Sequence, residues 1–237
     1  MRMLLLLTIS LFTSRVVFRE LGASDFGLYN VVAGFVMMLT FLNGAMSNAT
    51  QRFLSFELVK KDAIALRDVF CQIQILHAGI AIIVLILGET IGLWFVNNVL
   101  NIGEDRLFAA NIVYQCSLLS TVLSIISVPY NSVIIAHENM KLFAQIGLLE
   151  GCLKLAICFF LFISSFDKLI IYGISLAIIS IIIQLLYFKV CRKYEETFFY
   201  FSINKKKLKE IGLFALWSLC GSISTLANMQ GINILIN

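Results

Sequence analysis

The chain has 237 residues, of which 60% are apolar and 14% charged, and its mean hydropathy is +0.94. Because a soluble globular chain is about a quarter charged, this composition excludes a soluble domain and indicates a membrane protein. The net charge of +4 does not indicate nucleic-acid binding, since its excess lies in the loop 189–209. Basic residues in such a loop are typical of topology determinants that touch anionic lipid.

Apolar residues collect in continuous blocks of roughly 20, the length of helix that crosses a hydrocarbon core of about 30 Å. A transmembrane barrel would instead show alternating segments of about ten residues. The sequence therefore predicts an all-α, polytopic membrane protein, with spans at 3–19, 26–46, 73–96, 109–135, 142–164, 169–190 and 211–237. The last block reaches the end of the chain without a basic anchor, which suggests a truncated product.

Short polar segments separate the blocks, and basic residues are unevenly distributed among them. With the N-terminus placed in the cytoplasm, most of the 18 basic residues fall on the cytoplasmic side. This bias follows the positive-inside rule for short loops. We therefore expect a cytoplasmic N-terminus, with the segments 20–25, 97–106 and 165–168 on the opposite side.

The fifth block, 142–164, contains an acid and a base, Glu150 and Lys154. A charged side chain at the centre of a spanning helix costs about 2.5 to 3.5 kcal/mol, so such residues normally face a bundle interior or a wet cavity. The i, i+4 spacing with the acid first favours an ion pair. Gly147, Gly151 and Cys158 share the same helical arc. The arc therefore predicts either a packing seam or the wall of a hydrated cavity.

Other blocks carry further polar side chains. Arg15 shares a face with Arg19 in the first block, which indicates either a cavity wall or snorkelling to the outer headgroups. Asn30 and Asn43 add uncharged polarity to the second block, where a lone amide more often makes an interhelical hydrogen bond than a ligand contact. The fourth block has a stripe of small hydroxyl residues suited to close helix approach: Ser117, Ser120, Thr121, Ser124 and Ser127.

Two local features modify this plan. Pro129, the only proline, is expected to kink or end the fourth helix. After the second block, the apolar residues Phe53 and Leu54 alternate with charged ones, so this segment is too polar to cross the membrane. It predicts a short interfacial helix on the cytoplasmic surface. Arg52 would then lie at the inner mouth of any cavity.

The residues that usually carry chemistry form no recognisable pattern. Six cysteines and two histidines are scattered through the chain, without CxxC, HExxH, a glycine-rich phosphate loop or a nucleophile elbow. His77 is expected to pack against a neighbouring helix or to line a polar cavity. The sequence therefore predicts no catalytic residues, no metal and no cofactor, and the chain is not expected to be an enzyme.

The segment 11–58, beginning "LFTSRVVFRELGASDFGLYN", resembles polysaccharide and O-antigen flippases of the multidrug/oligosaccharidyl-lipid/polysaccharide (MOP) exporter superfamily, particularly Bacteroides-type lipopolysaccharide biosynthesis proteins. The stretches "ETIGLWFVNNVLNI", "VPYNSVIIAHENM", "SSFDKLIIYG" and "QGINILIN" resemble the same group. The resemblance implies a MATE-like fold of two six-helix lobes around a central cavity. Residues 1–210 would form one transmembrane lobe, and 211–237 the first helix of a second.

The resemblance implies a substrate, undecaprenyl-pyrophosphate-linked oligosaccharide, flipped across the bacterial inner membrane by alternating access. Membrane lipids and a second lobe or another copy of the chain would be its partners. On this hypothesis Arg15, Arg52 and Lys154 attract pyrophosphate, Asn30 and Asn43 bind sugar hydroxyls, and Glu150 holds Lys154 or carries a proton. A drug or metabolite cation antiporter of the same superfamily, a membrane glycosyltransferase or polymerase, and a non-transporting scaffold remain alternatives. The transferase would need a large loop with catalytic carboxylates, which this sequence lacks.

Overall fold

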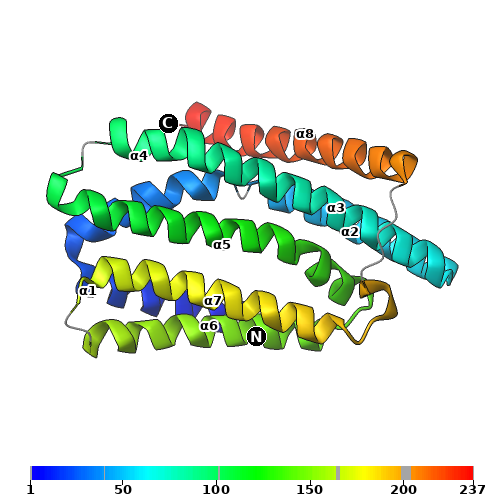
Figure 1. Cartoon of the computed structure of the whole chain (residues 1–237), viewed down its shortest axis with the longest axis horizontal. Coiled ribbons are helices and arrows are strands. Elements are labelled where there is room, and N and C mark those ends of the chain that lie inside the picture. The colour runs from blue at the N-terminus through cyan, green and yellow to red at the C-terminus, as the bar shows by residue number, and fades with distance from the viewer. Residues whose placement is uncertain (1, 40, 101, 164–165, 199–203, 237) are drawn as a thin grey trace.

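The computed structural model describes residues 2–39, 41–100, 102–163, 166–198 and 204–236. Within these ranges the chain is helical and contains no strand, which confirms the all-α prediction. Its elements are α1 (Arg2–Leu39), α2 (Phe41–Lys60), α3 (Ala63–Leu87), the π-helix η1 (Gly88–Gly92), α4 (Leu93–Asn98), α5 (Glu104–Ala136), α6 (Met140–Ile163), α7 (Lys168–Cys191), the 3-10 turn η2 (Glu195–Thr197) and α8 (Lys205–Ile236). Figure 1 shows the long helices running side by side along one direction.

Four helical runs in the described part of the chain are long and apolar enough to cross a membrane. They are Ala63–Asn98, which joins α3, η1 and α4, and the single helices α5, α6 and α7. These four contain or closely match the predicted spans 73–96, 109–135, 142–164 and 169–190. The chain is therefore a multi-pass membrane protein, whereas the predicted count of six spans is approximate.

The break predicted between the first two spans occurs inside α1. Gly22 has φ 79° and ψ 168°, which are not helical, and the helix resumes directly after it. This backbone region is essentially restricted to glycine. The two parts of α1 pack against α5, α6 and α7. The second predicted span, 26–46, is thereby divided between α1 and α2.

The prediction of a separate interfacial helix after the second span is wrong. Residues 47–60 instead continue α2, which packs against α3, α5 and α8. Met46, Thr50 and Leu54 are buried at intervals of four residues, so one face of α2 enters the core. The intervening charged residues lie on its other faces, which explains why the segment reads as too polar when only its composition is considered.

Helix α5 is the central element of the bundle, since it contacts α1, α2, α3, α6 and α7. The α5–α7 contact is especially close, because a Cβ placed on Gly173 would lie 3.1 Å from the Cγ2 and 3.3 Å from the Cα of Val113. Pro129 does not end the helix, which continues to Ala136. Figure 1 shows α5 bending over its last turns, as expected where a proline removes a backbone hydrogen bond.

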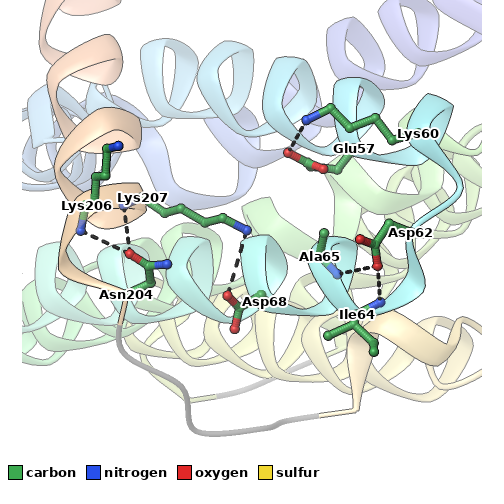
Figure 2. A network of polar contacts seen from close by, with 9 residues as sticks. All are labelled: Glu57, Lys60, Asp62, Ile64, Ala65, Asp68, Asn204, Lys206 and Lys207. Atoms are coloured by element: carbon green, nitrogen blue, oxygen red, sulfur yellow. Dashed lines mark hydrogen bonds and ion pairs between the residues drawn. The ribbon is translucent and has the colours of Figure 1, made fainter.

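The turn between α2 and α3 and the start of α8 lie at the same end of the molecule (Figures 1 and 2). Asp62 caps α3 by accepting hydrogen bonds from the backbone N–H groups of Ile64 and Ala65, at 3.1 and 3.0 Å. Asn204 accepts similar bonds from the first turn of α8. The ion pair between Lys207 and Asp68, at 3.8 Å, joins α8 to α3.

Candidate cavity between α1, α5, α6 and α7

A cavity of about 460 Å³ lies among side chains of α1, α5, α6 and α7. This volume is in the range of small-molecule binding sites in proteins. Hydroxyl groups dominate its polar lining: Tyr29, Ser117, Ser120, Thr121, Ser124, Ser127, Ser180 and Tyr187. Apolar side chains such as Val36 and Leu176 fill the spaces between them.

Glu150 and Lys154 both line this cavity. The Lys154 Nζ donates to the Glu150 Oε1 at 2.7 Å, and about two fifths of each side chain is exposed. The neighbouring Gly151 instead packs on α1, where an added Cβ would lie 3.1 Å from Leu6. Cys158 is buried, with its thiol 4.0 Å from the carbonyl oxygen of Thr13 in α1. The predicted arc therefore divides into a packing seam and a charged cavity wall.

The stripe of hydroxyl residues on α5 lines the cavity and does not serve mainly as a helix-packing surface. It was predicted to serve close helix approach, but all five of its residues line the cavity. Ser120 donates to the carbonyl oxygen of Cys116 at 2.9 Å, and Ser127 to that of Ser124 at 2.7 Å. Since a hydroxyl oxygen has two further lone pairs, these serines can still accept hydrogen bonds from a ligand.

Two amide side chains complete the polar lining, Asn131 on α5 and Gln184 on α7. Their side-chain oxygens are buried and accept no hydrogen bond from any described residue. A buried acceptor without a partner costs about 1 to 3 kcal/mol. A ligand or a water molecule with a suitable donor would recover this energy.

The other predicted site residues lie outside the cavity lining. Asn43 is nearest, because its Nδ2 donates to the hydroxyl of Ser124 at 3.1 Å and so orients a lining residue. Asn30 donates to the Phe26 carbonyl of its own helix. Arg52 lies 4.3 Å from the centre of the Phe214 ring, between α2 and α8. Arg15 is exposed on the first part of α1. Their roles in binding stay predictions.

Sequence reasoning missed several lining residues. Ser180 and Tyr187 are single polar residues within apolar segments, and Tyr29 stands beside the more polar Asn30, so no spacing distinguishes these three from surface or packing positions. Gln184 could have been suspected, because an amide inside a spanning segment is a weak indication of a polar contact. His77 is buried in α3 with its Nδ1 2.9 Å from the Ile73 carbonyl oxygen, and it is not among the lining residues.

No protein-family model matches the chain, and no curated protein matches it either. Among solved structures, the chain is similar to one described as a MOP superfamily transporter from Pyrococcus furiosus Vc1 (DSM3638), whose binding pocket of reverse polarity is said to suggest a different function. The TM-score is 0.75 at 12% sequence identity, and the match covers 96% of this chain and 52% of that chain. The chain thus has the helical fold of a MOP superfamily transporter over about half that protein's length.

Proposed function

We propose that the chain forms part of a transporter that moves a lipid-linked oligosaccharide, carried on undecaprenyl pyrophosphate, across the bacterial inner membrane. One observation carries the proposal: the Glu150–Lys154 pair borders a cavity whose other polar groups are mainly hydroxyls and amides. Such a lining suits a ligand that combines an anionic group with many hydrogen-bonding groups. The fold similarity to a MOP superfamily transporter supports a transport role in general.

In this proposal Lys154 attracts the pyrophosphate, and Glu150 holds the ammonium group in place until the ligand arrives. The bond between them is 2.7 Å long and stays within one helix, so it can break without moving any backbone. The α5 serines, Asn131 and Gln184 accept hydrogen bonds from sugar hydroxyls. The polyprenyl tail remains in the lipid. No covalent bond is made or broken in this scheme, so the protein would act as a carrier rather than an enzyme.

The presence of a carboxylate in the cavity supports a second candidate, a cation antiporter. Glu150 is the cavity's one carboxylate among the described lining residues, and its pairing with Lys154 leaves the wall without a net charge. If a cation or a proton displaced Lys154, Glu150 would become the binding group. The two candidates therefore differ in which member of the pair contacts the ligand.

Binding of undecaprenyl pyrophosphate to the purified chain in lipid nanodiscs tests the proposal, with undecaprenol as the uncharged probe. We expect Lys154→Leu to weaken binding of the pyrophosphate lipid by about ten- to a hundredfold, the value of a charge-assisted hydrogen bond. Lys154→Arg should retain most of the affinity, and binding of undecaprenol should not change. Native mass spectrometry of the nanodiscs reports the bound fraction of each lipid.

Lys60→Leu is the matched control, because Lys60 forms a similar pair with Glu57 at 3.0 Å on α2, outside the cavity lining. Its affinity should equal that of the unmodified chain. Equal affinities for Lys154→Leu and Lys60→Leu would refute a role for Lys154 in anion binding. Binding of tetraphenylphosphonium that is lost in Glu150→Gln would favour the antiporter instead.

A further inference from the structure

Five charged residues join three helices at the end of the bundle where α5 and α7 begin. Arg106 of α5 contacts Asp25 of α1 at 3.2 Å and Asp167, the N-cap of α7, at 2.6 Å. Lys168 of α7 contacts Glu20 of α1 at 2.7 Å. Figure 1 shows the first turns of α5 and α7 at the same end of the molecule. We call these five residues the end network.

The end network differs from an ordinary set of surface pairs in two respects. Glu20 and Asp25 are only 13% exposed, so their charges are poorly screened by solvent. They also lie on opposite sides of the Gly22 break in α1. Each bond therefore fixes a different part of α1 to α5 or α7. The network holds three separate helical segments together.

A layer of close contacts lies between the end network and the cavity. The Tyr29 and Tyr172 rings of α1 and α7 meet edge to face, with centroids 4.9 Å apart. Beside them, Gly173 allows α7 to approach Val113 of α5. At a rise of 1.5 Å per residue, Val113 is roughly 10 Å along α5 from Arg106.

Along each of the three helices, a residue of the end network comes first, then a residue of the contact layer, and then the cavity lining. On α5, network residue Arg106 is followed by Val113 and then by the lining residue Ser117. On α7, Asp167 precedes Gly173, which borders both the contact layer and the cavity. On α1, Asp25 precedes Tyr29 by one turn. The cavity is therefore closed at this end by a packed layer with an ionic layer outside it.

We infer that the end network is a latch that keeps the cavity closed toward this end, and that its ion pairs must part before a ligand can exchange on that side. The inference deepens the proposed function, since the latch controls access to the same cavity. The three linked segments, 20–25, 104–106 and 167–168, coincide with those predicted to face away from the cytoplasm. The latch would thus separate the cavity from the periplasm.

Cys116 provides a natural reporter, because it lines the cavity. In right-side-out vesicles that contain the full chain, a membrane-impermeant maleimide should label Cys116 slowly. Arg106→Gln removes both contacts of Arg106 and should raise the labelling rate by about three- to tenfold, which corresponds to the loss of two partly exposed ion pairs. Asp25→Asn combined with Asp167→Asn removes the same contacts from the other side and should give the same rise. Mass spectrometry of the Cys116 peptide measures the rate without removing other cysteines.

Lys60→Gln is the control. It also removes one positive charge and one ion pair, but the Lys60–Glu57 pair lies within α2 and does not link two helices. Its Cys116 rate should match that of the unmodified chain. Cys71, buried in α3 and absent from the cavity lining, reports general loosening and should stay unlabelled in every variant. Unchanged Cys116 labelling in both network variants would overturn the latch, as would a parallel rise at Cys71. The assay needs no substrate, so it stands or fails independently of pyrophosphate binding.

Discussion

Gly92 shows how a single missing side chain sets the geometry inside the longest apolar run. A Cβ at this position would lie 1.9 Å from the hydroxyl oxygen of Tyr114, so only glycine fits. The same hydroxyl donates to the carbonyl oxygen of Gly88 at 2.6 Å. Gly88 and Gly92 are the two ends of η1, and π-helical turns leave backbone groups in unusual positions. Tyr114 therefore fills the space beside η1 and satisfies one of its carbonyls.

Gly92→Ala should destabilise the protein, because the methyl group and the buried Tyr114 ring cannot occupy the same space. Overpacking of this kind costs about 1 to 3 kcal/mol. Thermal unfolding in detergent should show a lower midpoint. Gly79→Ala is the matched control, since no atom lies within 4 Å of its added Cβ. A midpoint for Gly92→Ala equal to that of Gly79→Ala would contradict the clash.

At the residue scale, the sequence predicted only part of the cavity. Glu150 and Lys154 could be singled out because two opposite charges at i, i+4 in an apolar segment need a common explanation. Tyr29 and Gln184 could not, because the sequence does not show which way an uncharged polar side chain points, and its environment depends on which helix packs beside it. The burial of Asn131 and Gln184 oxygens likewise becomes visible only once α5 and α7 are packed together.

Among the helices, α1 depends most on one backbone conformation. No atom lies within 4 Å of a Cβ built on Gly22, so only its φ of 79° and ψ of 168° restrict the residue type. The break lets the chain change direction between Glu20 and Asp25, which contact different partners. A continuous helix could not present both carboxylates to those partners in the same way.

Gly22→Ala should cost about 1 to 3 kcal/mol, the strain of placing a side chain in this backbone region. Gly27→Ala, in a regular part of the same helix and with nothing within 4 Å, should be neutral or slightly stabilising. The difference in unfolding midpoint between the two variants isolates the effect of φ. Identical midpoints would show that the break in α1 does not need glycine.

The predictability of the helices follows their surroundings. The observed bounds of α5, α6 and α7 lie within about five residues of the predicted spans, because their apolar segments are long and bounded by polar turns. The second part of α2 was misassigned as a surface helix. Leu54 is buried there by neighbouring helices, and that tertiary contact cannot be deduced from a mixed segment taken alone.

At the scale of the whole molecule, the loops fall into two groups, one at each end of the bundle. The end network brings together all three segments predicted to lie outside, while Lys60 and the Lys207–Asp68 pair lie at the end drawn in Figure 2. This grouping agrees with the predicted alternation of the loops, since the loops of one membrane side must share one end of a bundle, whereas which end faces the cytoplasm stays a prediction.

Cysteine substitution at each end tests the orientation. Asp105→Cys should react with an impermeant maleimide added to intact cells, and Lys205→Cys should react only after the membrane is opened. Both positions are exposed. Peptide mass spectrometry distinguishes the new cysteines from the natural ones. The reverse pattern would place the N-terminus outside and move the latch to the cytoplasmic side.

The association of α8 with the rest of the chain could not be predicted from the sequence. It was expected to begin a second lobe, yet it packs on α2 and α3, with the Phe214 and Phe53 rings 5.8 Å apart. A helix that packs on one lobe can still lead into another, so the division at residue 210 stays a prediction. The solved MOP transporter extends well beyond the matched region.

The run Ala63–Asn98 has 36 residues, whereas about 20 suffice to cross the hydrocarbon core. At 1.5 Å per residue it measures about 54 Å, and even a tilt of about 40° leaves it longer than the hydrocarbon core of about 30 Å. Figure 1 shows the α2–α3 turn projecting beyond the neighbouring helix ends. We therefore expect this turn to extend into the aqueous phase, where the exposed Asp62 carries its charge without cost to insertion. A soluble protein or an antibody fragment could bind this protruding turn without contacting lipid.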